Sequence, residues 1–284
     1  MAITRVGIVG SGIMGSGLCE VASKAGYEVV VRSRAQTTAD AIRTGLEQAL
    51  QRQVEKQRLD PQTCEEALER VTAVTDLDAM ADCDLVVESI VEDLATKQAL
   101  FSELAAICRE DAILATNTST LPVVELAMRT RRPDRVCGIH FFNPAPIMNL
   151  VEIIRAVTTS DATIADARGF IETCGKTAVE VKDRAGFIVN ALLFPYLNNA
   201  VKALDSGLAS RDDIDTAMRG ACNFPMGPLQ LLDLVGLDTS LAILESLHEE
   251  YADPNYAPAP LLRRLVAADR LGRKSGHGFY DYAT

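Results

Sequence analysis

The sequence predicts an α/β protein in which a doubly wound, mostly parallel sheet is followed by a second, all-helical C-terminal domain. The first half of the chain alternates short, continuously apolar, β-branched runs with helical stretches. Strands of that kind, separated by helices, are typical of a parallel sheet that helices cover on both faces. From about Gly186 the pattern changes to apolar residues at helical spacing, with no convincing strands.

Short apolar runs in the first half have the length and composition of strands, and longer stretches between them have helical periodicity. The strand candidates are Arg5–Val9, Glu28–Val31, Asp84–Val87, Ala112–Thr116, Val136–Ile139, Leu150–Ile154 and Ala178–Lys182. The helical candidates are Ile13–Ala25, Ala35–Arg58 and Glu92–Cys108. The last two strand candidates flank a further helix and are expected to extend the same sheet.

A second domain is expected to begin near Asp183–Gly186, which divides the chain into residues 1–185 and 186–284. The segment Ser210–Asp213 has the pattern of a capping box that opens one helix. The helical stretches expected in this domain are Gly186–Leu204, Asp212–Ala221, Leu229–Val235, Thr239–Tyr251 and Leu261–Ala268.

Charge and composition exclude several classes of protein. The 284 residues carry a net charge of −11, which argues against nucleic-acid binding because that requires a basic footprint. No apolar run approaches the ~18–20 residues of a membrane span. The N-terminus has no charged-then-apolar leader, so we expect a cytoplasmic protein without a membrane partner. The seven scattered cysteines lack Cys-x-x-Cys spacing and predict buried, reduced thiols, with no disulfide framework or metal site.

The segment Gly10-Ser11-Gly12-Ile13-Met14-Gly15 matches the dinucleotide-binding pattern G-x-G-x-x-G. It directly follows the first strand candidate and opens a helix, which is the context that the pattern requires. The glycines allow a tight turn and a close approach to a pyrophosphate, whose charge the helix N-terminus stabilises. A purely structural turn is the alternative. The context favours a Rossmann-type cofactor site that includes Gly10, Gly12, Ile13, Met14 and Gly15.

The second strand lacks the acidic residue that normally bonds the adenosine ribose of NAD, ~20 residues after the glycines. Arg32-Ser33-Arg34 stands there instead. Arginine recognises phosphate through paired hydrogen bonds, whereas an Asp would repel a 2′-phosphate. We therefore expect an NAD(P)-type cofactor contacted by Arg32, Ser33 and Arg34, with NADP favoured over NAD. The alternative is that the arginines are solvated and NAD binds without its usual acid.

His140 is the best candidate for a catalytic group among the three histidines. It follows the strand candidate Val136–Ile139, and open α/β sheets bind ligands at the carboxyl ends of their strands. Imidazole exchanges protons near pH 7, as an alcohol–carbonyl interconversion requires. Glu152 lies in the apolar run Leu150–Ile154, where a buried carboxylate needs a partner. His140 would supply that partner, and an ion pair with an arginine is the alternative.

Further polar residues could complete this site. Asn117-Thr118-Ser119-Thr120 follows another strand candidate, Asn143 lies shortly after His140, and Asn190 lies early in the first helix of the second domain. Such residues are helix caps or turn formers as easily as ligands. Their combination with His140 makes them candidates.

Taken together, these segments resemble the L-3-hydroxyacyl-CoA dehydrogenase family, especially its bacterial 3-hydroxybutyryl-CoA dehydrogenase branch. The resemblance extends nearly end to end, and the histidine segment with its downstream Glu and Asn is far more specific than the glycine loop. The matching segments are Gly10–Gly17, Val87–Lys97, Asn117–Ser119, His140–Pro144, Val151–Glu152, Gly186–Asn190, Pro225–Pro228 and Gly272–Tyr280.

The resemblance implies roles for the residues near the reaction. His140 matches the family's catalytic base and Glu152 matches the partner of that base. Ser119 and Asn190 match positions that bond the reacting oxygen and the thioester end of the substrate. Asn143 matches a supporting amide. The implied reaction interconverts a short-chain (S)-3-hydroxyacyl-CoA, such as 3-hydroxybutyryl-CoA, and acetoacetyl-CoA by hydride transfer with NAD(P).

The resemblance also implies contacts further from the reacting atoms. Glu92, Lys97 and Asn117 match cofactor contacts near the nicotinamide half. Arg52 and Lys56 lie in a segment that resembles the CoA-contacting helix, and their spacing places both on one helix face. Members of the family usually form homodimers through the helical domain, so residues 186–284 are expected to bind substrate and to dimerise.

One position departs from the family, and other functions stay open. Most members carry Asp where this chain has Ser33, which puts the usual NAD assignment in doubt. The 3-hydroxyisobutyrate and 6-phosphogluconate dehydrogenases share the glycine pattern, but their catalytic lysine has no counterpart here before Lys202. The remaining alternatives are a dehydrogenase of thioesters on an acyl carrier protein and a non-catalytic dinucleotide-binding protein.

Overall fold

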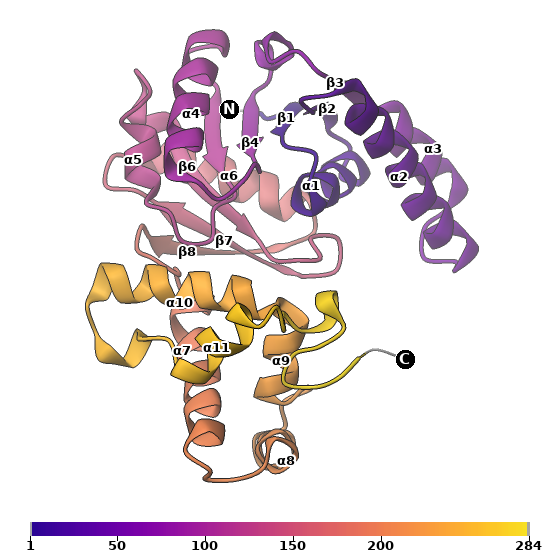
Figure 1. The fold of residues 1–284 in the computed structure, drawn as a ribbon. Coiled ribbons are helices and arrows are strands. Elements are labelled where there is room, and N and C mark those ends of the chain that lie inside the picture. Colours follow the sequence, from indigo (N-terminus) through magenta and orange to yellow (C-terminus); the bar gives the residue numbers. More distant parts are fainter. Residues whose placement is uncertain (1, 283–284) are drawn as a thin grey trace. The chain divides into compact units, whose positions relative to one another are not determined.

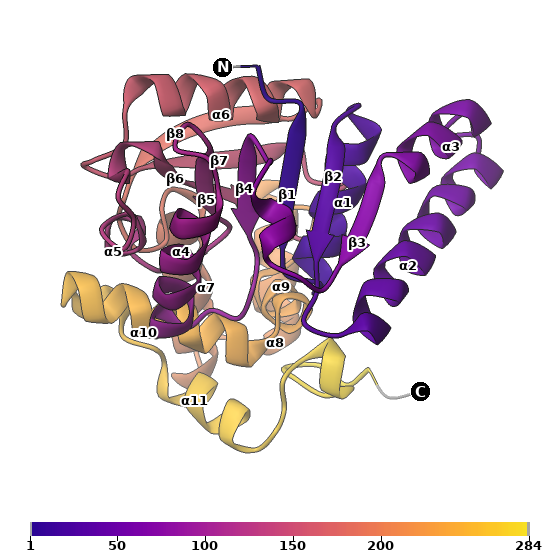
Figure 2. The same cartoon turned by 90° about the horizontal axis from the view of Figure 1, so that it is seen from above.

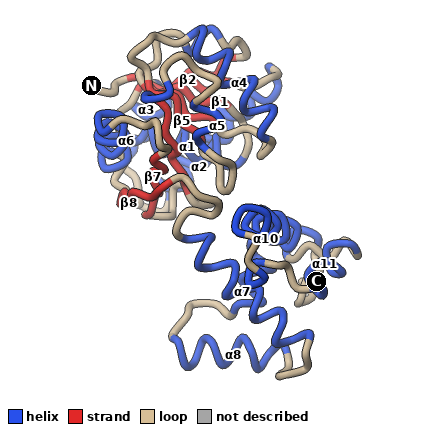
Figure 3. The backbone as a smooth tube through the Cα atoms, turned by 90° about the vertical axis from the view of Figure 1, so that its left-hand side faces the viewer, coloured by secondary structure: helices blue, strands red, loops and turns tan. Residues whose placement is uncertain are grey.

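The computed structural model describes residues 2–282 and divides the chain into two compact units, Met1–Asp183 and Arg184–Thr284. Each unit has its own hydrophobic core. Within residues 2–282, every named strand lies in the first unit, and the second unit consists of helices joined by loops (Figure 3). The predicted α/β architecture with an all-helical second part is therefore confirmed.

The first unit is built on one eight-stranded sheet with the order β3-β2-β1-β4-β5-β6-β7-β8. Every neighbouring pair is parallel except β6 and β7. The strand order reverses between β1 and β4, and such switch points are where open α/β sheets bind ligands. The strands are β1 (Arg5–Val9), β2 (Glu28–Arg32), β3 (Val71–Val74), β4 (Leu85–Glu88), β5 (Ile113–Thr116), β6 (Val136–Phe141), β7 (Leu150–Arg155) and β8 (Thr177–Lys182).

Helices cover both faces of this sheet (Figures 1 and 2). Helices α1 and α6 pack on one face, α2 and α3 lie beside α1, and α4 and α5 cover the other face. Ile139 and Ile153 belong to the core under α1 and α6, so the alternating His140 and Glu152 face the opposite way. The helices are α1 (Ile13–Lys24), α2 (Gln36–Glu55), α3 (Pro61–Glu69), α4 (Leu94–Ile107), α5 (Val123–Ala127) and α6 (Asp161–Thr173).

Among the described residues, the structure adds two α-helices and one strand, α3, α5 and β3, that the sequence pattern does not indicate. Strand β3 is an edge strand of four residues in which only Val71 is buried, so it has no continuous apolar run. Helix α3 has Asp60 as its N-cap and Pro61 at its first turn, which is a recognisable start. Its nine residues are too short for a persistent apolar period.

The second unit packs its helices around a leucine-rich core. Ser210 caps α8 by accepting from the backbone N–H of Asp213, as the capping-box pattern predicts. Among the described residues, no helix combines the length and apolar character needed to cross a membrane. The helices are α7 (Val189–Asp205), α8 (Arg211–Cys222), α9 (Pro228–Val235), α10 (Leu237–Tyr251) and α11 (Pro260–Ala267).

The cysteines agree with the sequence prediction except at Cys174, which is only partly buried, and Cys222. All seven are free, and most are buried. Burial raises the pKa of the Cys19 and Cys137 thiols to about 12, so both stay protonated near neutral pH. The expectation of buried thiols is wrong for Cys222, which is exposed at the last position of α8. That helix is strongly polar and buries only Asp215, which leaves its end in solvent.

Candidate active site

The glycine-rich loop between β1 and α1 has the geometry that a dinucleotide requires. Gly10 has φ of +130°, and a Cβ there would lie 2.2 Å from the carbonyl oxygen of Ser89. A Cβ at Gly15 would lie 2.0 Å from the carbonyl oxygen of Gly10, whereas one at Gly12 would meet no atom within 4 Å. The first and third glycines are thus needed for the turn and for packing, and the second leaves space for a pyrophosphate.

The start of α1 is also suited to an anion. Its N-cap is Gly12, and no side chain caps the helix, so its first N–H groups are open to a phosphate. Ile13 is 76% exposed at this end, while Met14 packs partly against the core. The loop therefore fits an NAD(P)-type cofactor, held by backbone groups and the helix N-terminus.

The end of β2 places three predicted cofactor residues in different environments. Ser33 is buried, and its hydroxyl lies 2.9 Å from that of Ser11 in the glycine loop and also contacts Thr38. The Nε of Arg32 donates to the carbonyl oxygen of Thr75, 3.1 Å away. Arg34 is exposed. Of the two arginines, Arg34 is thus the better placed to reach a ligand without giving up a bond in the fold.

His140 and Glu152 form a buried pair across the antiparallel strands β6 and β7. They are register partners, so their side chains extend from the same face of the sheet. The Nδ1 of His140 lies 2.7 Å from a carboxylate oxygen of Glu152, and the two residues are 4% and 0% exposed. The carboxylate accepts from Nδ1–H, which leaves Nε2 as the nitrogen that can exchange a proton.

Ser119 and Asn117, which follow β5, lie next to this pair. The Ser119 hydroxyl is 3.2 Å from Nε2 of His140, so it marks the side of the ring on which a reacting oxygen would bind. The side-chain oxygen of Asn117 accepts from the backbone N–H of Phe141 at 2.8 Å. That bond fixes the end of β6 directly after His140. The ring of Phe142 lies 4.5 Å from the His140 ring, between centroids.

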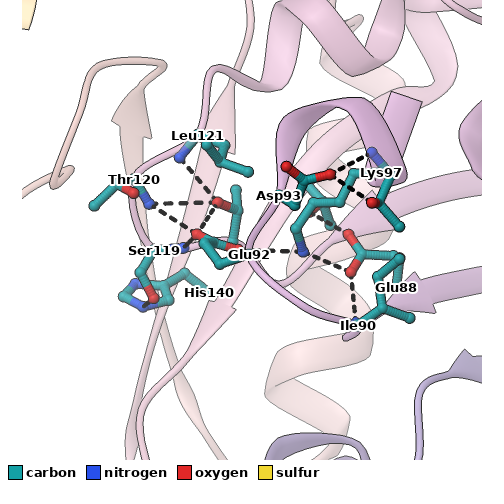
Figure 4. Close-up of polar contacts among 12 residues, drawn as sticks. Glu88, Ile90, Glu92, Asp93, Lys97, Ser119, Thr120, Leu121 and His140 are labelled. Carbon is teal, nitrogen blue, oxygen red and sulfur yellow. Dashed lines mark hydrogen bonds and ion pairs between the residues drawn. The ribbon is translucent and has the colours of Figure 1, made fainter. Parts of the chain in front are cut away.

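Glu92 and Lys97 lie on the same side of the sheet and are tied to each other (Figure 4). A carboxylate oxygen of Glu92 accepts from the backbone N–H of Ser119 at 2.8 Å. Lys97 in α4 is almost wholly buried and forms ion pairs with Glu92 at 3.2 Å and Glu88 at 2.6 Å. Its ammonium group is therefore held inside the protein by two carboxylates. Glu88 is a site residue that the sequence analysis missed.

Asn143 lies in the turn after β6, and its side chain is exposed. A buried lysine that the sequence analysis also missed holds this turn. The Nζ of Lys176 donates to the carbonyl oxygens of Ala145, Pro146 and Met148 at 2.9, 3.1 and 2.9 Å. Burial lowers the pKa of Lys176, and the positive charge of Lys24 adds to that effect. No sequence signal identifies Lys176, because its partners are backbone atoms.

The structure does not gather every predicted residue around His140. Arg52 lies in the last turn of α2 and Lys56 is its C-cap, and both are exposed. They lie four residues apart at one end of this helix, where two cations can act on the same anion. Asn190 belongs to the other unit, where it is buried at the second position of α7.

Comparisons with known proteins agree with this geometry along the whole chain. Residues 5–184 match the family described as "3-hydroxyacyl-CoA dehydrogenase, NAD binding domain", and residues 186–282 match "3-hydroxyacyl-CoA dehydrogenase, C-terminal domain". A 3-hydroxybutyryl-CoA dehydrogenase of Mycobacterium tuberculosis is 45% identical over 99% of both chains. The mitochondrial hydroxyacyl-coenzyme A dehydrogenase of Mus musculus is 42% identical, over 99% of this chain and 91% of its own.

Solved structures give the same result. The (S)-3-hydroxybutyryl-CoA dehydrogenase of Ralstonia eutropha is 40% identical and superimposes with a TM-score of 0.97 over 100% of both chains. The 3-hydroxybutyryl-CoA dehydrogenase of Escherichia coli also has a TM-score of 0.97, at 37% identity, over 99% of this chain and 60% of its own. The chain belongs to the 3-hydroxyacyl-CoA dehydrogenase family.

Proposed function

We propose that this protein interconverts a short-chain (S)-3-hydroxyacyl-CoA, 3-hydroxybutyryl-CoA, and the corresponding 3-oxoacyl-CoA, acetoacetyl-CoA. The observation that carries the proposal is the buried His140–Glu152 pair with Ser119 beside Nε2, near the carboxyl ends of β5 and β6 in the sheet that carries the dinucleotide loop. The full-length similarity to 3-hydroxybutyryl-CoA dehydrogenases supports a short acyl chain.

In the proposed reduction, NADH or NADPH supplies a hydride to C3 when it is bound. His140, as an imidazolium, donates its Nε2 proton to the 3-oxo oxygen, and Glu152 keeps the ring oriented through Nδ1. The Ser119 hydroxyl stabilises negative charge on that oxygen. Asn190 is proposed to contact the thioester end, and Asn143 to support the site. In the oxidation, Nε2 of His140 accepts the hydroxyl proton.

The direct test is the reduction of acetoacetyl-CoA, followed by the fall in absorbance of the reduced nicotinamide as the cofactor is oxidised. We expect turnover with acetoacetyl-CoA and much less with the same acyl group on an acyl carrier protein. Turnover with the carrier-protein thioester, and none with acetoacetyl-CoA, would show that the substrate is bound to an acyl carrier protein and not to CoA. No turnover with either would overturn the proposal.

We also propose that the cofactor is NADP(H) in preference to NAD(H). The support is the absence of an acid at the end of β2, where Ser33 is held by Ser11, and the exposed Arg34 that follows it. A guanidinium contact to the 2′-phosphate adds about 1.5–3 kcal/mol at best, and less where solvent screens it.

The cofactor proposal is tested by measuring kcat/KM with NADPH and NADH on the parent and on the Ser33→Asp, Arg34→Ala double variant. We expect the parent to prefer NADPH and the variant to prefer NADH, because an Asp bonds the ribose diol and repels the 2′-phosphate. A parent that prefers NADH about tenfold, equal to about 1.4 kcal/mol, would show that Arg34 remains in solvent.

We propose that Arg52 and Lys56 bind phosphates of CoA. Both are exposed at the end of α2 and are close enough to act together. Removing both charges in an Arg52→Gln, Lys56→Gln variant is expected to raise KM for acetoacetyl-CoA and to weaken its dependence on salt, while kcat changes less. An unchanged KM would exclude these residues from CoA binding.

The quaternary structure and location are the remaining proposals. We propose a homodimer formed through the helical unit, which exposes large apolar side chains such as Leu192 (72%) and Leu208 (77%). Exposed apolar side chains that gather into one patch are typical of an interface. Light scattering of the full-length protein should give twice the monomer mass, and a monomer at micromolar concentration would contradict the proposal.

A cytoplasmic location is proposed from the sequence alone.

A further inference from the structure

Glu88 has no assigned part in the proposed reaction, yet it is one of the most completely enclosed acids of the first unit. It ends β4 and is 0% exposed. One carboxylate oxygen accepts from the backbone N–H of Ile90 at 2.7 Å and from Nζ of Lys97 at 2.6 Å. The other accepts from the hydroxyl of Thr116 at 2.7 Å. Burying a carboxylate is costly unless donors of this kind surround it.

Lys97 connects Glu88 to the residues next to His140. Its ammonium group lies between Glu88 and Glu92, at 2.6 and 3.2 Å. The other oxygen of Glu92 accepts from the backbone N–H of Ser119 at 2.8 Å and from the hydroxyl of Thr118. Figure 4 shows these side chains in one connected series that ends where Ser119 lies beside His140.

The two carboxylates that hold Lys97 differ in exposure, so removing the charge of Glu88 should affect the position of Lys97. The side chain of Glu88 is 0% exposed, and that of Glu92 is 38% exposed. Without the charge of Glu88, the buried ammonium keeps only its partly solvated partner. Because an uncompensated buried charge is strongly unfavourable, Lys97 is then expected to move toward water and to draw Glu92 with it. The turn at Ser119 would lose the acceptor of its N–H group.

We propose that Glu88 is a positioning residue, which acts through Lys97 and Glu92 to hold the Ser119 turn against His140. Glu88 itself does not contact the reacting atoms. The inference rests on the proposed function, because it explains how Ser119 is kept within reach of Nε2. Glu88 lies at the β1–β4 switch point, and His140 lies two strands away, on β6. Glu88 would thus influence the hydrogen bond between Ser119 and His140 from that distance.

The test compares Glu88→Gln with a matched control, Asp84→Asn. Asp84 directly precedes the same strand, is 6% exposed, and is likewise surrounded by donors, from Thr4, Arg5 and Arg109. It lies at the amino end of β4, so its loss perturbs the fold without touching the series that leads to Ser119. Both changes remove one charge from a buried, hydrogen-bonded acid.

The first readout needs no substrate, so it stays informative if the proposed reaction is wrong. The chain has three histidines, so a long-range ¹H–¹⁵N spectrum of the imidazole rings resolves them individually. We expect Glu88→Gln to shift the Nε2 resonance of His140 and to leave those of His248 and His277 in place. We expect Asp84→Asn to leave all three unchanged. A His140 resonance unmoved by Glu88→Gln would overturn the proposal.

The second readout is turnover with acetoacetyl-CoA. A displacement of about 1 Å in an active site can cost about a hundredfold in rate, so Glu88→Gln is expected to lower kcat at least about tenfold, with a much smaller change in KM. In a Lys97→Met background, Glu88→Gln should have little further effect, because the two residues act in series. Additive losses, or equal losses in the Asp84→Asn control, would contradict the inference.

A third variant covers the case in which Glu88→Gln does not fold. Thr116→Val removes one donor to Glu88 and leaves every charge in place. It should shift the His140 resonance in the same direction as Glu88→Gln, by a smaller amount, and lower kcat about threefold, a change worth less than 1 kcal/mol. An unchanged resonance together with a parental kcat would overturn the proposal as firmly as the first comparison.

Discussion

Buried carboxylates have different partners in the two units of this protein. In the first unit, Glu152 contacts His140 and Glu88 contacts Lys97, which are both ionisable side chains. In the second unit, Asp215 accepts from the backbone N–H groups of Leu229 and Gln230 and from the Tyr280 hydroxyl. No formal cation is among those donors. All three acids are at most 1% exposed, so burial alone does not distinguish them.

The difference lies in what the partner can do. Backbone N–H groups at the start of α9 need an acceptor, because Gly227 has no side chain to cap them, and Asp215 provides it. Such an acid holds the fold together. A carboxylate against a histidine or a lysine stabilises a charge that can appear, move or take part in binding. The partners of a buried acid therefore indicate its role better than its burial does.

The largest effect that this comparison predicts is on His140. In a His140→Gln variant, the amide can still bond Glu152 but cannot exchange a proton. We expect kcat to fall by about 10²–10⁴-fold, the usual contribution of general acid–base catalysis. Thermal unfolding and cofactor binding should stay close to those of the parent. Turnover within about threefold of the parent, well outside that range, would remove His140 from the mechanism.

The opposite pattern is expected for Asp215. An Asp215→Asn change turns one acceptor into a donor that faces an N–H group of α9. We expect the free energy of unfolding to fall by about 1–3 kcal/mol, the penalty for an unsatisfied buried polar group. We expect kcat at room temperature to stay near that of the parent. Circular dichroism on heating and a turnover assay measure the two quantities. A variant with parental stability but no turnover would show that Asp215 acts in catalysis, and would contradict the difference proposed between the two units.

The smallest predicted effect concerns acid stability, where two other buried acids should act in opposite directions. Burial raises the pKa of Asp84, but donors from Arg5, Thr4 and Arg109 outweigh it, so its pKa lies below the ordinary 3.8. Burial raises the pKa of Asp233 above 3.8, and its backbone donors offset only part of that rise.

The sign of each contribution follows from these directions. Asp84 contributes stability above pH 3.8, which is lost as the pH falls through its lowered pKa. Asp233 contributes stability at pH below 3.8, which is lost as the pH rises through its raised pKa. Between neutral pH and the acid range, Asp84→Asn should therefore flatten the loss of Tm on acidification, and Asp233→Asn should steepen it. Parallel curves for both variants would show that these shifts do not control acid stability.

Much of the first unit could be predicted because its strands are continuous apolar runs, and polar residues begin where each strand ends. Glu152 could be identified because a carboxylate within such a run must have a partner. The same reasoning applies to Glu88, which ends the run in β4. The partner of Glu88 could not be identified in this way, because Lys97 lies on a helix nine residues later.

Other features could not be predicted from the sequence, for physical reasons. Strand β3 is short and lies at the sheet edge, so its pattern is weak. Lys176 is held by three backbone carbonyls, and any residue type could provide those. The contacts of Ser33 with Ser11 and Thr38 join segments distant in the chain, which only the folded sheet brings together.

The most direct measurement is turnover and thermal stability of Glu152→Gln, determined on the same preparation. The amide can still accept a hydrogen bond from Nδ1 of His140, but it cannot stabilise the imidazolium. We expect kcat for acetoacetyl-CoA reduction to fall by about tenfold or more, a sizeable part of the usual acid–base contribution, while Tm stays close to that of the parent. A variant with parental turnover, or one that fails only because it unfolds, would contradict the account of Glu152 as the partner of a catalytic histidine.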